Sequence, residues 1–134
     1  MTRSSSGRFA LVAGAVLSGI AVAAGAFGAH GLKETLAASG QSDAWETACR
    51  YAIYHGLALL ATGLLARLPP APPAAVTHAA SVSFCAGTVI FSGCLAALAL
   101  SGIKILGAIV PIGGVLMLVG WGLLAYAATR RGAA

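Results

Sequence analysis

The sequence predicts an all-α protein that crosses a lipid bilayer four times as a bundle of transmembrane helices. The 134 residues are 59% hydrophobic and only 8% charged, whereas soluble domains hold roughly 25% charged residues. The apolar residues form long runs with a Lys or Arg near their ends, and the 18 glycines allow helices to approach closely in lipid. We expect residues 1–134 to form one integral membrane domain.

The first helix is predicted over residues 9–29, which carry no charge and at about 1.5 Å per residue cover a hydrocarbon core of about 30 Å. A cleaved signal peptide is the alternative, because Arg3 and Arg8 precede the run and the small residues 24–26 could form a cleavage site. The polar residues 30–43 that follow fit a short interfacial helix.

The second helix is predicted over residues 46–68. Asp43 and Glu46 have the spacing of a capping box, and Trp45 between them suits the headgroup level. The proline-rich residues 69–73 lack most of the N–H groups that a helix needs, so we expect a linker outside the hydrocarbon.

The third and fourth helices are predicted over residues 79–100 and 105–129. Pro111 lies inside the last apolar run, where it removes a backbone donor. Together with Gly113 and Gly114 it predicts a kink or break near the start of this helix.

Basic residues predict that both termini are cytoplasmic, because positive charges gather on the cytoplasmic side. Four crossings place five of them on the side of the termini and three on the other: Arg3, Arg8, Arg67, Arg130 and Arg131 against Lys33, Arg50 and Lys104. Their positions at helix ends also argue against a nucleic-acid-binding face.

The second helix carries the polar side chains that are expensive inside a bilayer and therefore of most interest. Thr47, Tyr51 and His55 are four residues apart and share one face, while Arg50 and Tyr54 form a neighbouring stripe. His55 can pass protons or bind a ligand. Two alternatives are a hydrogen-bonded fastener between helices, which we favour, and a metal ligand. No second acid or histidine inside the membrane completes a proton relay.

Several polar residues and the helix break fall at a similar depth, which predicts a vestibule in the outer leaflet. Its candidate residues are His30, Arg50, Tyr51, Tyr54, His55 and Ser92, with the break at Pro111, Gly113 and Gly114. The alternative is that these residues only pack the bundle. We find no catalytic triad, CxxC or HExxH pattern, so we predict no catalytic residues, no metal and no cofactor.

Five ordered motifs resemble a known family. They are residues 25–32 (GAFGAHGL), Trp45-x-Thr47, Tyr51-x-x-x-His55-x-Leu57-Ala58, Phe91-Ser92-Gly93, and Pro111-Ile112-Gly113-Gly114 followed by Gly120-Trp121. The chain resembles the bacterial membrane family called domain of unknown function 423, which is similar to the eukaryotic transmembrane protein 256. The resemblance implies a four-helix protein of the bacterial inner membrane and brings no catalytic residues.

Function follows less directly from the sequence than fold. We expect a non-catalytic protein that contacts the lipid bilayer and acts by binding, either as an accessory subunit of a larger membrane complex or as a homo-oligomer. The alternative is a small transporter or proton-coupled carrier that uses the vestibule around His55.

Overall fold

The structure is a computed structural model that describes residues 3–131, with side chains from residue 5 onward. The Arg3 side chain, counted in the charge balance above, therefore lies outside the described residues. The helices are α1 (Arg3–Ala29), α2 (Lys33–Ala38), α3 (Ser42–Arg67), α4 (Ala74–Ser101) and α5 (Ile105–Thr129). The predicted all-helical architecture is confirmed, since the described chain holds no strand.

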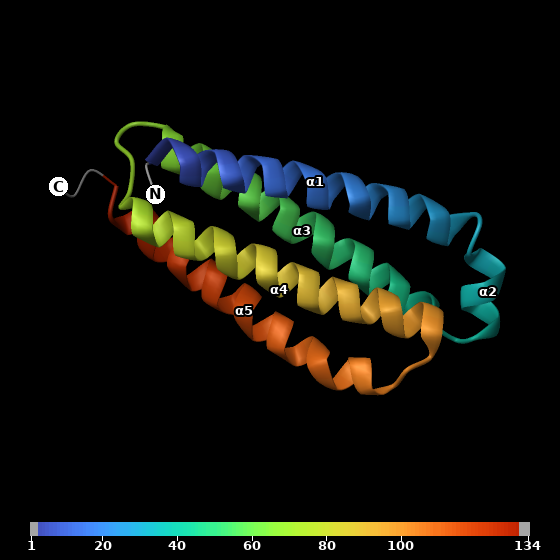
Figure 1. The fold of residues 1–134 in the computed structure, drawn as a ribbon. Helices are drawn as coiled ribbons and strands as arrows, with labels where there is room; N and C mark the ends of the chain where they lie inside the picture. Colours follow the sequence, from blue (N-terminus) through green and yellow to red (C-terminus); the bar gives the residue numbers. More distant parts are fainter. Residues whose placement is uncertain (1–2, 132–134) are drawn as a thin grey trace.

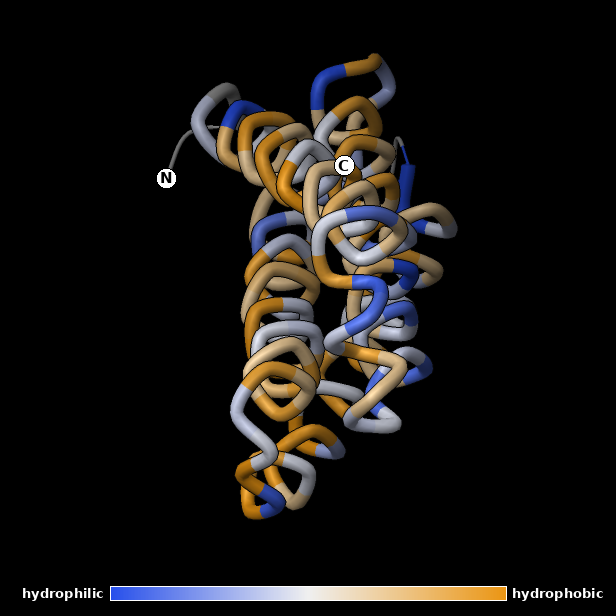
Figure 2. Tube along the Cα trace, turned by 90° about the vertical axis from the view of Figure 1, so that its right-hand side faces the viewer, coloured by the Kyte–Doolittle hydropathy of each residue, from blue (hydrophilic) through white to orange (hydrophobic). Residues whose placement is uncertain are grey.

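The four long helices lie side by side and alternate in direction (Figure 1). Helix α3 packs against both α1 and α4, α5 packs mainly against α4, and α1 touches α4 over a shorter stretch. The start of α1 and the end of α5 lie at the same end of the bundle, whereas α2 and the α4–α5 turn lie at the opposite end. Hydrophobic residues dominate the trace along the helices (Figure 2).

Three helical segments among the described residues are long and apolar enough to cross a bilayer: Ser5–Ala29, Ala74–Ser101 and Ile105–Thr129. Membrane-spanning helices are therefore present, as predicted. Helix α3 is not among them, because its first half carries the polar residues discussed below.

Some predicted ends differ from the structure. Helix α1 begins at Arg3 rather than residue 9, and α4 begins at Ala74, directly after Pro73, rather than residue 79. Both helices extend into polar or small residues that hydropathy alone does not mark as helical. The predicted capping box is wrong: α3 begins at Ser42, and no side chain within the described part of the chain caps its start.

Glycines bring α1 and α3 into backbone contact at two levels. A Cβ atom placed on Gly14 would lie 2.6 Å from the carbonyl oxygen of Gly56, and one on Gly63 would lie 2.9 Å from that of Gly7. Real Cβ atoms essentially never come within 3.0 Å of a backbone atom. The α1–α3 pair therefore depends on small residues, as helix pairs in lipid commonly do.

Helices α4 and α5 meet in the same way. A Cβ on Gly113 would lie 2.7 Å from the Gly87 oxygen, and one on Gly87 would lie 2.9 Å from the Gly113 oxygen. A break at this point is wrong, because α5 continues through Pro111 and both following glycines, whereas a kink at Pro111 stays a prediction. Spanning helices tolerate a proline where neighbouring groups compensate for the lost bond, and Gly113 here serves close packing against α4.

Candidate functional site

His55 lies in the middle of α3 and is only 5% exposed. Trp121 of α5 donates its Nε1–H to His55 Nε2 over 3.2 Å. An indole N–H can only donate, so Nε2 must be the unprotonated nitrogen of a neutral ring. The proton is then on Nδ1, which lies 2.8 Å from the backbone oxygen of Tyr51 and donates to it. Both ring nitrogens are thus used, and His55 joins α3 to α5.

Aromatic rings from three helices surround this histidine. The Trp121 ring meets the His55 ring edge-on at 6.0 Å between centroids, and Phe84 of α4 lies 5.8 Å from His55. Tyr51 stacks on Phe91 of α4 at 4.8 Å. Phe84, Phe91 and Trp121 are not among the predicted site residues, although the last two occur in the family-like motifs. Apolar aromatic residues in an apolar helix carry no signal of their own.

An outward-facing recess of about 510 Å³ adjoins the cluster, between α3, α4 and α5. It is lined by Tyr51, Tyr54, His55, Phe91, Gly114, Met117, Leu118 and Trp121. Four residues of the predicted vestibule therefore do lie together: Tyr51, Tyr54, His55 and Gly114.

The remaining residues of the predicted vestibule lie elsewhere. Arg50 is half exposed and forms an ion pair with Glu46 one turn earlier, at 2.5 Å. His30 is exposed directly after α1, and Ser92 lines a separate cavity on another side of α4. These residues were predicted to line one vestibule because they lie at a similar depth along their helices. Their side chains instead point in different directions around the helix axes.

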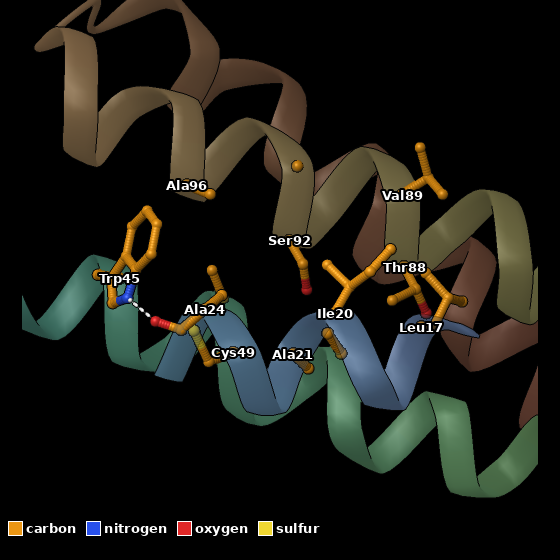
Figure 3. Close-up of a pocket in the computed structure, with 13 residues that line it drawn as sticks. Leu17, Ile20, Ala21, Ala24, Trp45, Cys49, Thr88, Val89, Ser92 and Ala96 are labelled. Carbon is orange, nitrogen blue, oxygen red and sulfur yellow. Dashed lines mark hydrogen bonds between the residues drawn. The ribbon is translucent and has the colours of Figure 1, made fainter. Parts of the chain in front are cut away.

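The separate cavity has a volume of about 240 Å³ and lies between α1, α3 and α4. Figure 3 shows Ser92 pointing from α4 into this space, while the Trp45 ring lies toward one end of it. Trp45 donates its Nε1–H to the backbone oxygen of Ala24 at 2.9 Å, which ties α3 to α1. Almost all the other lining side chains are apolar.

Neither space resembles a metal site. Within residues 3–131, no three His, Cys, Asp or Glu side chains lie close enough together to hold a metal ion. The hydrogen bonds of His55 satisfy polar groups of α3 inside an apolar bundle. Lipid hydrocarbon could not satisfy them, because it has no hydrogen-bond donors or acceptors.

Comparison with known proteins agrees with the motifs. The model of a family described as "Protein of unknown function (DUF423)" matches residues 24–114. UPF0382 membrane proteins of two staphylococci are similar over most of their length. That of Staphylococcus saprophyticus is 45% identical over 116 residues, covering 83% of this chain and 88% of the relative. That of Staphylococcus epidermidis is 44% identical over 120 residues, covering 90% and 94%.

A UPF0382 membrane protein of Staphylococcus aureus is 44% identical over 117 residues, covering 87% of this chain and 92% of the relative. No solved structure matches the chain significantly. Neither the family description nor the names of these relatives assign a biochemical role. The predicted resemblance is confirmed, and the chain belongs to the DUF423 family of membrane proteins.

Proposed function

We propose that the protein crosses the cytoplasmic membrane of a bacterium four times and acts there by self-association rather than by catalysis. Support for the fourth crossing comes from α3, whose 26 residues extend about 39 Å, more than the hydrocarbon thickness of about 30 Å. It packs between α1 and α4, so a bilayer that holds those two helices also surrounds α3. Its polar groups are paired: His55 inside the bundle, and Arg50 with Glu46.

Charge supports an orientation with both termini in the cytoplasm. The end of the bundle that holds the helix ends at Arg67 and Thr129 also carries Arg8, Arg130 and Arg131. All three acidic residues of the chain lie at the opposite end: Glu34 in α2, with Asp43 and Glu46 in the first turns of α3. Lysine and arginine are retained on the cytoplasmic side, which favours this orientation.

The main support for self-association is the outer face of α1. Ala15, Gly19 and Ala23 are four residues apart and all exposed, so they form a stripe of small residues along the helix. A Cβ atom placed on Gly19 would meet no described atom within 4 Å. Such stripes let two helices approach closely in lipid, where van der Waals contact drives association.

The pairing of His55 also favours a binding role over proton transport. A carrier needs a nitrogen that exchanges protons with a pathway, but in this structure Trp121 and the Tyr51 carbonyl occupy both ring nitrogens. If His55 Nε2 were protonated, its N–H would face the N–H of Trp121, and neither donor would have an acceptor there. We therefore assign His55 to helix packing.

Disulfide trapping tests self-association directly. Ala23→Cys in a background with Cys49, Cys85 and Cys94 replaced by Ala should form a covalent dimer in oxidised native membranes. Adding Gly19→Leu should reduce the trapped dimer about tenfold, which corresponds to a loss of roughly 1.4 kcal/mol of association free energy. Gly122→Leu is the matched control, since Gly122 on α5 also has open space around its Cβ position among the described atoms.

A monomer that resists trapping at position 23 would contradict the proposal. So would equal trapping in Gly19→Leu and Gly122→Leu, because the α1 stripe would then have no special role. Trapping of a different membrane protein at position 23 would replace self-association by the role of an accessory subunit.

A further inference from the structure

Four arginines lie at the end of the bundle where α1 begins and α5 ends: Arg8, Arg67, Arg130 and Arg131. All three acidic residues of the chain lie at the opposite end, and so does the ion pair of Arg50 with Glu46. Basic clusters next to spanning helices attract anionic lipid headgroups. The chain itself offers no acidic side chain that could neutralise this end.

The arginines differ in what they contact. Arg130 donates from Nε to the Tyr126 hydroxyl at 3.1 Å, and Arg131 donates from Nε to the backbone oxygen of Pro70 at 3.1 Å. Arg8 is exposed and forms no hydrogen bond or ion pair with any residue from 3 to 131. Its guanidinium group is therefore available to an anion from outside the chain.

Arg8 also lines a groove between α1 and α4, which has a volume of about 450 Å³. The groove exists because α1 touches α4 over only a short stretch. Beyond Arg8 and Ser5 at one end, the lining is apolar or weakly polar: Phe9, Val12, Ala13, Val16 and Leu17 of α1, with Cys85 of α4. A charged group therefore lies at one end of a groove whose walls are apolar.

The groove lies within one leaflet of a bilayer. From Phe9 to Leu17, α1 rises about 12 Å, whereas half of a hydrocarbon core of about 30 Å is about 15 Å. Both α1 and α4 are among the apolar spans, so the groove walls face acyl chains. Arg8 directly precedes the charge-free residues 9–29, and its long side chain can extend to the headgroup level.

Three sources of an anion can be compared. A second copy in the same orientation carries its acidic residues on the other side of the membrane. A soluble anion such as inorganic phosphate would meet the charge of Arg8 but would gain nothing from the apolar walls. A phospholipid with a negatively charged headgroup matches both, because its phosphate suits the guanidinium group and its acyl chain suits the walls.

We propose that the groove between α1 and α4 binds an anionic phospholipid, whose phosphate pairs with Arg8 and one of whose acyl chains lies along Val12 and Val16. Arginine can bind a phosphate through two parallel N–H···O bonds. None of the stripe residues Ala15, Gly19 and Ala23 lines the groove, so lipid binding and self-association are separate properties. The inference needs α1 and α4 in the bilayer but not the fourth crossing.

Photolabelling in vesicles tests the inference. The probes are phosphatidylglycerol, which is anionic, and phosphatidylcholine, which has no net charge, each with the same diazirine on one acyl chain. Peptide mass spectrometry of the full-length protein compares label on Val16, in the groove, with label on Val115, which is exposed on α5. We expect the ratio of the two to be about fivefold higher with phosphatidylglycerol, which corresponds to about 1 kcal/mol for one basic residue near the surface.

Arg8→Gln tests the headgroup contact. Arg131→Gln is the matched control, because Arg131 lies at the same end of the bundle but does not line the groove. Arg8→Gln should remove the preference for phosphatidylglycerol, whereas Arg131→Gln should keep it. Equal ratios for the two lipids in the unaltered protein would overturn the proposal. Equal loss in both variants would also overturn it, since the whole basic end would then attract anionic lipid without a site at Arg8.

Val12→Trp tests the groove. Val12 and Val22 are both exposed on α1, at 59% and 62%, but Val22 does not line the groove. Val12→Trp should fill the groove and remove most of the label from Val16, whereas Val22→Trp should leave it in place. Equal label on Val16 in the two variants would contradict binding of an acyl chain there. Label on Val115 reports insertion in every variant, so a failure to insert is told apart from a failure of the site.

Discussion

At the scale of single residues, His55 acquires its role from its two hydrogen-bond partners. A histidine inside a spanning helix is the polar residue of most interest in the sequence, and a fastener between helices is its predicted role. The structure supplies the partner that the sequence did not reveal, Trp121, 66 positions away. A partner at that distance depends on how α3 and α5 pack, which no local pattern encodes.

A double-mutant cycle measures this contact. Trp121→Phe keeps the aromatic ring but removes the N–H donor, and His55→Phe removes the acceptor. We expect a coupling free energy of about 0.6 kcal/mol and at most about 1.7 kcal/mol, the range for hydrogen bonds inside membrane proteins. The measurement is reversible unfolding in mixed detergent micelles.

Trp45→Phe is the control for that cycle, because its N–H donates to Ala24 instead of His55. Its effect should add to that of His55→Phe, as expected for sites that share no partner. Additive effects of Trp121→Phe and His55→Phe would contradict the fastener role.

Residue counting along a helix predicts depth but not the direction in which a side chain points around the helix. Arg50, Tyr51 and His55 are close in sequence, yet Arg50 pairs with Glu46 and stays half exposed, while His55 is buried. Ser92 directly follows Phe91, but the two line different spaces on α4. Which side of a helix faces a neighbour is fixed by packing between helices, and in a chain apolar on all sides the sequence offers little contrast to reveal it.

At the scale of elements, particular glycines decide how closely the helices pack. The abundance of glycine predicts close packing, and small residues four apart mark Gly25, Gly87 and Gly93 as contacts between helices. Of these three, only Gly87 has described atoms within 4 Å of an added Cβ. Gly14, Gly56, Gly87 and Gly113 meet a backbone atom of the facing helix, whereas a Cβ on Gly93 would meet no described atom within 4 Å. The proline-glycine segment of α5, predicted as a break, is a packing surface for the same reason.

Gly113 and Gly114 offer a direct test of this account. A Cβ on Gly113 would lie 2.5 Å from the backbone nitrogen of Phe91, whereas one on Gly114 would come no nearer than 3.9 Å to the Phe91 ring. Gly113→Ala should therefore lower the free energy of unfolding by about 1–3 kcal/mol relative to Gly114→Ala, the usual cost of overpacking. Both changes alter helix propensity equally, so their difference isolates the contact.

Unfolding in mixed micelles, followed by circular dichroism, measures that difference. Equal stability of the two alanine variants would show that α4 and α5 do not approach each other as the structure has them.

At the scale of the whole molecule, composition alone predicted helices in a membrane, and the structure and the relatives agree. The number of crossings, four, is a more detailed prediction than the presence of helices in a membrane. Helix α3 is less apolar than its neighbours, and its place between α1 and α4 becomes visible only once the helices are packed. The i to i+4 order of Glu46 and Arg50 predicts their ion pair, which the structure confirms, but sequence patterns could not show that His55 pairs with Trp121 inside the bundle.

Reporter fusions at the two termini test the four crossings most directly. In bacteria, green fluorescent protein reports a cytoplasmic end and alkaline phosphatase an external one. Because an even number of crossings returns the chain to the side on which it started, we predict fluorescence and no phosphatase activity at both the N-terminus and the C-terminus. Termini on opposite sides, with an active phosphatase at only one of them, would show an odd number of crossings and contradict the account.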